Sequence, residues 1–213
     1  MSDFIRAKKY YDNFSRVYDL LSSKHYYHNA RSFAVKELGL KPEQTVLNVP
    51  CGTGQNFEYF QEYLQNTGNI IGIDLSTGML EKAKNKCTNN QWTNIRLFNA
   101  NVLEIDKNWT KKNVKDESSF GIDAVLSDLG LSGFPEWEKI IDNLLSILKP
   151  GGKIVLMDWY LEKNSLRGEF VKLIGKGEVN RPLWQYLKTR VANFHLNDTF
   201  NRNGVFVASG NKV

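Results

Sequence analysis

Along most of the chain, short runs of apolar residues alternate with stretches in which apolar residues recur at the spacing of a helix. The apolar runs cover residues 46–49, 69–74, 94–98, 121–127 and 153–158, and helical spacing covers 56–64, a segment that begins at Ser76, and 135–148. Short apolar runs bounded by turn residues are typical of buried strands. Five strands that alternate with helices predict an α/β fold built on a doubly wound, mostly parallel sheet.

The two ends of the chain have other patterns. Apolar residues recur at helical spacing over 4–22, which predicts a helix, and a second helix is expected over 25–38. Because both precede the first strand, we expect them to form a helical lid over the open end of the sheet. Residues 194–209 predict two strands about a turn at 201–204, and therefore an antiparallel C-terminal hairpin.

Two further segments interrupt this pattern. Residues 106–119 are polar and Lys-rich, and they predict an irregular surface insertion. Residues 163–191 predict helical pieces that are broken at Gly175, Gly177 and Pro182.

The composition is that of an ordinary globular protein, with 41% hydrophobic and 24% charged residues. No apolar run has the length of a membrane span, and no charged-then-apolar leader stands at the N-terminus, so a cytoplasmic location is the expectation. The two cysteines, Cys51 and Cys87, lack the spacing of a disulfide framework or of a zinc site, so no metal site is expected.

The formal net charge of +5 is unevenly placed, because basic residues outnumber acidic ones late in the chain. The basic residues are Lys163, Arg167, Lys172, Lys176, Arg181, Lys188 and Arg190, against Glu169 and Glu178. A solvated helical face is the favoured interpretation. The alternative is contact with phosphates, either peripherally on an anionic membrane or, with less support, on nucleic acid.

The stretch from Val46 to Phe57 is the main candidate for binding chemistry. An apolar strand leads into Gly52-x-Gly54 and then into a helix, which is the arrangement of a nucleotide-binding turn. Glycine suits such a turn because the backbone bends sharply and a ligand must approach bare N–H groups. The next strand ends in Asp74, at about the distance from the turn where a carboxylate reaches the ribose hydroxyls of a nucleoside.

The same turn argues against two other nucleotide folds. A dinucleotide fingerprint needs a third glycine where Phe57 stands, and a P-loop needs a Gly-Lys-Ser/Thr end, which the turn lacks. The turn therefore favours a ligand that contains adenosine but no pyrophosphate.

With these features in place, the chain resembles the class I S-adenosylmethionine-dependent methyltransferases over residues 45–158. The resemblance also rests on Asn99-Ala-Asn101-Val102, on Leu148-Lys-Pro-Gly-Gly-Lys-Ile-Val155 and on the terminal hairpin. It implies a Rossmann-like, seven-stranded, mostly parallel sheet with an antiparallel C-terminal hairpin, and S-adenosyl-L-methionine as the cofactor.

Two segments are similar to one group within that family. Tyr11-Asp-Asn-Phe-Ser-Arg-Val-Tyr18-Asp and Asp74-Leu-Ser-Thr-Gly-Met-Leu resemble segments of the methyltransferases of ubiquinone and menaquinone synthesis and of phospholipid-headgroup N-methyltransferases. We therefore expect residues 1–213 to form one methyltransferase domain. Its expected parts are a helical cap (1–40), a cofactor-binding core (45–158), a helical insertion (160–192) and the terminal hairpin (193–210).

The resemblance also implies cofactor contacts. Gly52 and Gly54 would let N–H groups approach the methionyl part, Asp74 would accept hydrogen bonds from the ribose hydroxyls, and Asn101 would accept one from the adenine amino group. The full set of implied cofactor residues is Tyr11, Asn48, Pro50, Gly52, Gly54, Asn56, Asp74, Leu75, Met79, Asn101, Val102 and Ser127.

Two positions in the turn depart from the family pattern. Asn48 stands where the family usually ends its first strand with an acidic residue, and Pro50 replaces the first glycine. A neutral amide attracts the amino group of the cofactor less strongly than a carboxylate does, and proline removes one N–H donor.

The implied activity is in-line methyl transfer to nitrogen or oxygen of a small molecule or lipid headgroup. Asp128, Tyr18 and His25 are the candidate catalytic residues: Asp128 and His25 as bases, and Tyr18 by its resemblance to tyrosines that close over the cofactor. Two alternatives remain open. One is an RNA or protein methyltransferase that uses the basic 163–190 region, and the other is a non-enzymatic S-adenosylmethionine-binding protein of the same fold.

Overall fold

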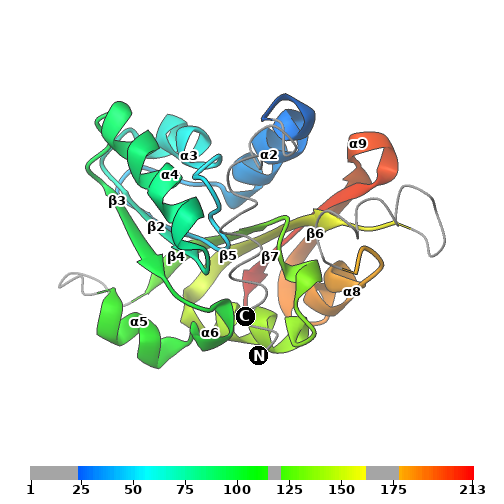
Figure 1. Cartoon of the computed structure of the whole chain (residues 1–213). Coiled ribbons are helices and arrows are strands. Elements are labelled where there is room, and N and C mark those ends of the chain that lie inside the picture. The colour runs from blue at the N-terminus through cyan, green and yellow to red at the C-terminus, as the bar shows by residue number, and fades with distance from the viewer. Residues whose placement is uncertain (1–23, 115–120, 162–177) are drawn as a thin grey trace, which may run out of the picture.

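The computed structural model describes residues 24–114, 121–161 and 178–213. Its centre is a seven-stranded sheet in the order β3-β2-β1-β4-β5-β7-β6 (Figure 1). The strands are β1 (Thr45–Asn48), β2 (Asn69–Asp74), β3 (Ile95–Asn99), β4 (Ile122–Asp128), β5 (Leu148–Trp159), β6 (Val191–Thr199) and β7 (Val205–Lys212). The first five run parallel, and β7 lies antiparallel between β5 and β6. The predicted fold class is therefore confirmed.

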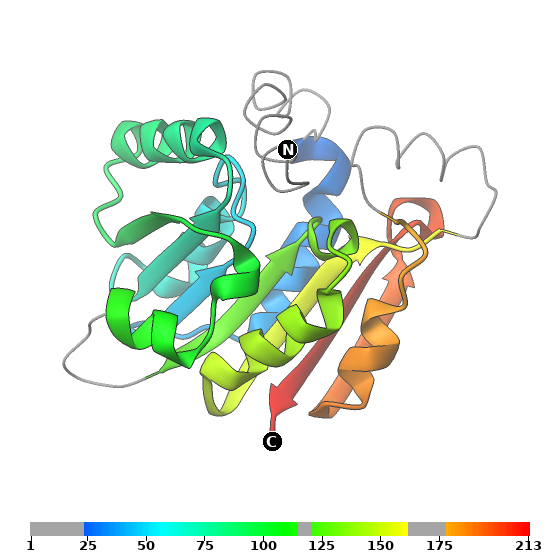
Figure 2. The ribbon, with the colours of Figure 1, turned by 60° about the horizontal axis from the view of Figure 1, so that its bottom comes forward.

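Helices cover both faces of this sheet. They are α2 (Lys24–Leu38), α3 (Phe57–Leu64), α4 (Thr77–Asn89), α5 (Lys107–Asn113), α6 (Trp137–Ile147), α8 (Leu183–Lys188) and α9 (Phe200–Asn203), with single 3₁₀ turns η1 (Val102–Glu104) and η2 (Leu131–Gly133). Figure 1 shows α2, α3 and α4 above the sheet and α5, α6 and α8 below it. In the turned view α5, α6 and α8 lie in front of the sheet, and α2 and α3 lie behind it (Figure 2).

The alternation of side chains along each strand explains the two faces. Val46 packs into the cluster under α2 and α3, whereas Leu47 packs into the opposite cluster with α6. Strands that are buried on both faces read as continuous apolar runs, and this is why residues 69–74 could be assigned to β2 from the sequence with the observed bounds.

The position of helix α2 differs from the lid that we expected the helix over 25–38 to form. The helix lies on the face of the sheet against β4, β5 and β7, as a layer of the core (Figure 1). Ala30 and Ala34 are fully buried, and their small side chains allow the helix to approach the strands closely. The predicted helix over 4–22, with Tyr11 and Tyr18, lies outside the described residues.

The prediction of an irregular insertion over 106–119 is wrong for α5. Asp106 is the N-cap residue of this helix, because its side chain accepts a hydrogen bond from the backbone N–H of Trp109 at 2.8 Å. Trp109 in turn packs edge-on against Phe98, with ring centroids 5.3 Å apart. This cap and this aromatic contact stabilise the short polar helix, and neither produces an apolar stripe.

The hairpin and the helical insertion agree with prediction where they are described. Strands β6 and β7 pair antiparallel about α9, where Asn201 and Arg202 adopt left-handed backbone angles, with φ of 50° and 56°. Pro182 is the N-cap residue of α8. Among the described residues, none of the helices combines the length and the hydropathy that crossing a bilayer requires.

Candidate active site

A cavity of about 410 Å³ opens at the carboxyl ends of the parallel strands. The strand order reverses between β1 and β4, and doubly wound sheets bind ligands outside the strand ends at such a reversal. The lining residues come from α2, from the ends of β2 and β4, from the segments that follow β1 to β4, and from the first turn of α4. They are Arg31, Val49, Pro50, Cys51, Gly52, Thr53, Gln55, Asn56, Ile73, Asp74, Leu75, Met79, Ala100, Asn101, Val102, Leu103, Asp128, Leu129, Gly130, Gly133, Phe134, Pro135 and Glu136.

At one end of the cavity, two backbone N–H groups orient the carboxylate of Asp74. One oxygen accepts from Gly52 at 2.8 Å, and the other accepts from Ser76 at 2.9 Å. Ser76 is also the N-cap residue of α4, where its hydroxyl accepts from the N–H of Met79. An ionised carboxylate has about four acceptor sites, so this orientation still permits bonds to ligand hydroxyls.

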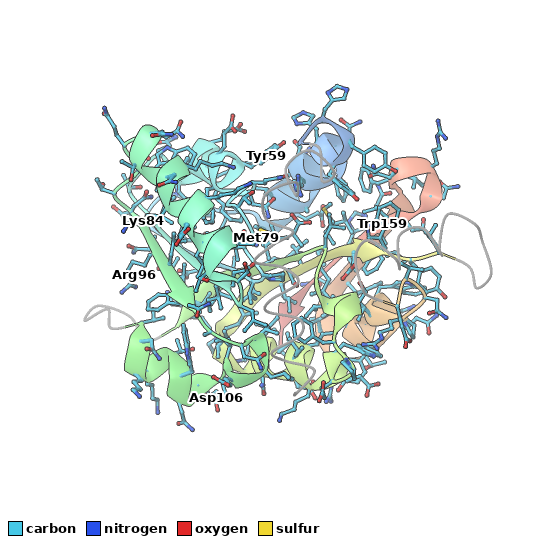
Figure 3. The ribbon with its side chains drawn as sticks, viewed as in Figure 1. Tyr59, Met79, Lys84, Arg96, Asp106 and Trp159 are labelled. Carbon is cyan, nitrogen blue, oxygen red and sulfur yellow. The ribbon has the colours of Figure 1, made fainter. Side chains whose placement is uncertain are left out.

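The neighbouring wall is mostly apolar. Leu75, Met79 and Val102 line it, and Met79 projects from α4 toward the centre of the molecule (Figure 3). Asn101 lines it as well, and its Oδ1 accepts the N–H of Leu103 at 3.1 Å as the cap of η1. That oxygen therefore has a structural partner besides any ligand.

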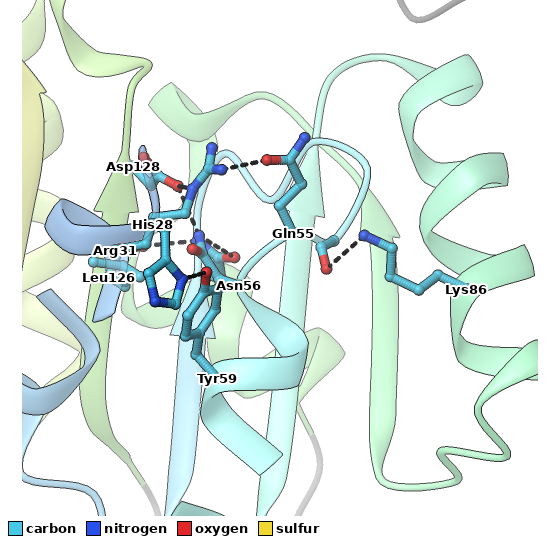
Figure 4. Close-up of polar contacts among 10 residues, drawn as sticks. His28, Arg31, Gln55, Asn56, Tyr59, Lys86, Leu126 and Asp128 are labelled. Carbon is cyan, nitrogen blue, oxygen red and sulfur yellow. Dashed lines mark hydrogen bonds and ion pairs between the residues drawn. The ribbon is translucent and has the colours of Figure 1, made fainter. Parts of the chain in front are cut away.

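The other end of the cavity holds a buried polar network (Figure 4). Arg31 Nε donates to Asp128 Oδ2 at 3.0 Å, and Asn56 Nδ2 donates to the same oxygen at 2.9 Å. Arg31 Nη1 also donates to Gln55 Oε1. The side chains of Arg31 and Asp128 are only 2% and 5% exposed, so the network contains a buried ion pair.

Asn48 lies behind this network and is not among the residues that line the cavity. Its Nδ2 donates to the carbonyl of Leu126 and its Oδ1 accepts from Asn56 Nδ2, both at 3.3 Å. The structure thus places Asn48 as a support for Asn56, which differs from the direct cofactor contact implied by the sequence.

Two other implied contact residues also lie outside the lining. Gly54 has a φ of +73°, donates its N–H to the carbonyl of Cys51, and would bring a Cβ within 2.6 Å of the Phe57 ring. Its place is therefore explained by turn geometry and packing. Ser127 is buried, and its hydroxyl has no partner within the described part of the chain.

Comparison of the sequence with known protein families assigns the chain to one of them. The model of the ubiE/COQ5 methyltransferase family matches residues 4–167. The chain belongs to this family. A demethylmenaquinone methyltransferase of Oceanobacillus iheyensis is 28% identical over 72% of this chain and 61% of its own length. A 2-phytyl-1,4-naphtoquinone methyltransferase of Nostoc is 29% identical over 77% of this chain and 68% of its own length.

Solved structures agree on the fold. Phosphoethanolamine N-methyltransferase 2 of Haemonchus contortus, in complex with phosphomonomethylethanolamine and S-adenosylhomocysteine, superposes with a TM-score of 0.74 at 15% identity, over 99% of this chain and 60% of that one. Geranyl diphosphate C-methyltransferase of Streptomyces coelicolor superposes with a TM-score of 0.68 at 11% identity, over 87% of this chain and 76% of that one. The chain spans about three fifths of the length of several curated relatives, the Oceanobacillus protein among them.

Within this ubiE/COQ5 site, most of the predicted positions line the cavity. They are Pro50, Gly52, Asn56, Asp74, Leu75, Met79, Asn101, Val102 and Asp128. His25, a predicted catalytic residue, is exposed on the first turn of α2 and is not part of the lining. Burial, and then the charge of Asp74, raise the pKa of the Cys51 thiol well above its usual value, which fits a packing residue better than a nucleophile.

Sequence reasoning missed Arg31 and Gln55. The buried face of α2 includes Tyr27, Ala34 and Leu38, and Arg31 stands four residues after Tyr27 on that face. An arginine on the buried stripe of a helix is the signal that was available, because charged residues are almost never fully buried unless they are paired. Gln55 carried no comparable signal.

A third buried carboxylate, that of Asp158, supports the loop that follows β4. Asp158 is 1% exposed, and it accepts bonds from the hydroxyl and the N–H of Ser132 at 2.9 and 3.0 Å and from the N–H of Trp159 at 2.8 Å. Burial raises its pKa to about 6, although these hydrogen bonds oppose the rise. Because Ser132 belongs to η2, Asp158 links the end of β5 to the loop that borders the cavity.

This raised pKa predicts a pH dependence of folding. The folded chain binds the Asp158 proton more tightly than the unfolded chain, so the stabilisation is complete below about pH 4 and is lost as pH rises through about 6. The loss should amount to roughly 3 kcal/mol. Denaturant unfolding of the native chain and of Asp158→Asn at pH 4 to 7 measures it as the difference between the two curves. Parallel curves would contradict the prediction.

The basic late segment is partly neutralised where it is described. Arg190 pairs with Asp142 at 2.7 Å, and Arg181 lies 3.6 Å from Glu178. The ammonium of Lys188 stands 6.0 Å from the ring centroid of Phe194. Lys163, Arg167, Lys172 and Lys176 lie outside the described residues. Both interpretations of this segment stay predictions.

Proposed function

We propose that this chain is an S-adenosylmethionine-dependent methyltransferase that acts on a small-molecule acceptor. The observation that carries the proposal is the carboxylate of Asp74 at the end of β2, held by two backbone N–H groups beside a cavity at the reversal of strand order. Membership of the ubiE/COQ5 methyltransferase family supports the same activity.

The residues in the cavity fit this cofactor. The volume of about 410 Å³ lies within the roughly 300–1,000 Å³ that is usual for small-molecule sites. Asp74 suits the ribose hydroxyls, and Leu75 and Val102 offer an apolar surface for adenine. At the opposite end, Asn56 Oδ1 and Asp128 Oδ1 are buried acceptors without a partner among the described residues, and an ammonium group would satisfy them.

When bound, the cofactor supplies a methyl group that is already activated by its positively charged sulfur. The residues of the chain then mainly align the acceptor with the methyl carbon and exclude water, which can lower the barrier by several kcal/mol. The predicted role of Asp128 as a base remains a proposal. Its Oδ2 is already shared by Arg31 and Asn56, and this arrangement favours a positioning role.

For the acceptor, we propose a small molecule with a quinone or reduced quinone ring, because the curated relatives are named as quinone methyltransferases. A lipid or phosphate headgroup is the second choice, supported by the overall likeness to the phosphoethanolamine enzyme. A cytoplasmic location and a peripheral membrane contact through the late basic segment stay predictions from the sequence.

Methyl transfer from labelled cofactor tests the proposal. The purified chain is incubated with S-adenosylmethionine carrying a labelled methyl group and either a reduced naphthoquinone, phosphoethanolamine, RNA or fractionated extract, and the products are identified by mass. We expect label on a small molecule. Label on RNA or protein would favour the first alternative function, and binding of cofactor without transfer to any fraction would favour the non-enzymatic one.

A further inference from the structure

We infer that a second cavity, at the amino ends of the parallel strands, binds the phosphate group of a small ester or of a lipid headgroup. The cavity has a volume of about 310 Å³ and shares no lining residue with the candidate active site. The inference goes beyond methyl transfer and does not depend on it.

This phosphate cavity lies at the edge of the sheet opposite the candidate active site. Thr45 begins β1, Gly121 directly precedes β4 and Leu148 begins β5, and all three line the cavity. The antiparallel strand β7 ends at this edge, where Lys212 completes the lining (Figure 2). The other walls are α5 and the end of α6, which lie side by side below the sheet (Figure 1). Segments that are distant in the sequence therefore form one hollow.

Helix α5 turns a basic face toward the phosphate cavity. Its lining residues are Lys107, Thr110, Lys111 and Val114. Their spacing of i, i+3, i+4 and i+7 places them on one side of the helix. The side of a surface helix that faces the protein is usually apolar. In α5 this side carries two ammonium groups, so it presents charge where packing alone would favour apolar side chains.

The charge of the lining has one sign. Among the described residues that line the cavity, the charged ones are Lys107, Lys111, Lys149 and Lys212. Asp123, which is not part of the lining, compensates one of them, since its Oδ1 accepts from Lys149 Nζ at 2.8 Å. No carboxylate in the described part of the chain forms an ion pair with the other three lysines. Positive charges gathered in one hollow repel one another, and an anion relieves that repulsion.

The backbone fixes the position of Lys212 in this cluster. Its ammonium donates to the carbonyl of Ser146 at 3.0 Å and to that of Leu148 at 2.6 Å, at the end of α6. One of its three N–H bonds remains for a ligand. Burial, and then the charge of Lys107, lower the pKa of the Lys212 ammonium. A negative ligand opposes the effect of Lys107, and the fixed position of the ammonium reduces the ordering cost of binding.

The size and chemistry of the walls favour a phosphate ester. The volume of about 310 Å³ is at the lower end of the roughly 300–1,000 Å³ that is usual for small-molecule sites. A phosphate monoester has a charge of about −1.5 to −2 at pH 7 and three strong acceptor oxygens, so it can engage several lysines at once. Val114, Ile147 and Pro150 offer an apolar wall to the organic part of the ester.

Phosphorus NMR titration tests the inference. The probes are inorganic phosphate and glycerol 3-phosphate, in chloride buffer at constant ionic strength, and we expect the native chain to bind both. In the double variant Lys107→Gln, Lys111→Gln, affinity should fall at least about tenfold, as for the loss of charged hydrogen bonds. Both side chains are exposed, so the fold should persist.

A charge-matched variant is the control. Lys112→Gln, Lys139→Gln removes two exposed lysines from α5 and α6 that do not line the cavity. It changes the net charge equally and should leave both affinities within about twofold of the native values. Equal losses in the two double variants would overturn the inference, because they would show attraction to overall charge instead of to this cavity.

Acetylation of lysines in the native chain, mapped by mass spectrometry, gives a second readout that needs no variant. Inorganic phosphate at about ten times its Kd should slow modification of Lys107, Lys111 and Lys212 by about tenfold, since only the unoccupied site reacts. Lys112 should react at the same rate with and without phosphate. Equal effects on Lys112 and the three lining lysines would contradict a defined site.

Sedimentation with vesicles distinguishes the two sources of phosphate. The vesicles contain phosphatidylcholine with or without phosphatidic acid. Binding to phosphatidic acid that is lost in Lys107→Gln, Lys111→Gln and kept in the control would assign the cavity to a lipid headgroup, and binding of glycerol 3-phosphate alone would assign it to a soluble ester. Binding of neither would overturn the inference. Titration of the same samples with S-adenosylhomocysteine tests the proposed function separately, at the opposite edge of the sheet.

Discussion

Asp74→Ala should weaken the binding of S-adenosylmethionine by about 100-fold or more. Two hydrogen bonds from ribose hydroxyls to a carboxylate contribute roughly 1.5–3 kcal/mol each, and every 1.4 kcal/mol is a factor of ten in affinity. The substitution also leaves the N–H groups of Gly52 and Ser76 without their acceptor, so the turn that forms the cavity wall loses its support. Calorimetric titration with the cofactor measures the change.

The matched control for this variant is Asp106→Ala. Asp106 also accepts a backbone N–H, that of Trp109, but it lies at the edge of the molecule away from Met79 and the cavity (Figure 3). Loss of this helix cap should lower the free energy of unfolding by about 1 kcal/mol and leave cofactor affinity unchanged. Native affinity in a folded Asp74→Ala chain would remove Asp74 from the binding site.

The strands and the sheet were predictable because the hydrophobic pattern encodes them directly. Residues 69–74 are apolar, end in a carboxylate, and form β2 with those bounds. Helix α5 was missed since its seven residues have no buried side chain and depend on the cap at Asp106. The place of α2 was missed for another reason: periodicity shows that a helix has an apolar face, but it does not show which surface that face covers.

The candidate site was predictable as far as the topology determines it. Residues that follow the carboxyl ends of parallel strands meet at one edge of the sheet, and this brings Asp74, Asn101 and Asp128 to the same cavity. The direction of single side chains is the part that the topology does not determine. Asn48 and Ser127 each stand one residue before a lining residue, Val49 and Asp128, and successive residues of an extended chain point to opposite sides.

Contacts between residues far apart in the sequence are the other feature of the site that could not be predicted. Arg31 and Asp128 are 97 positions apart, and their contact depends on the packing of α2 across β4. Neither residue carries a local motif that would predict the pair. Arg31 was therefore not predicted, although its burial could have been suspected from its place on the apolar stripe of α2.

Gly130→Ala should disrupt the cavity from the side of β4. A Cβ at Gly130 would lie 2.3 Å from Cγ and 2.6 Å from Cδ of Pro50, well inside contact distance. The proline ring cannot rotate away, so the backbone of one of the two loops must shift. Because both residues line the cavity, we expect cofactor affinity to fall at least tenfold, with a loss of stability of roughly 1–3 kcal/mol, as for overpacked cores.

Thermal unfolding and calorimetry of Gly130→Ala measure the two effects, and two variants identify their cause. Gly133→Ala adds the same methyl group to the same loop, where nothing lies within 4 Å, so its stability should change by less than about 0.5 kcal/mol. Pro50→Ala removes the atoms that the new methyl group would meet. The double variant Pro50→Ala, Gly130→Ala should therefore lose less than the sum of the single losses, because the two positions share one contact. Additive losses would show that Gly130 acts through something other than its approach to Pro50.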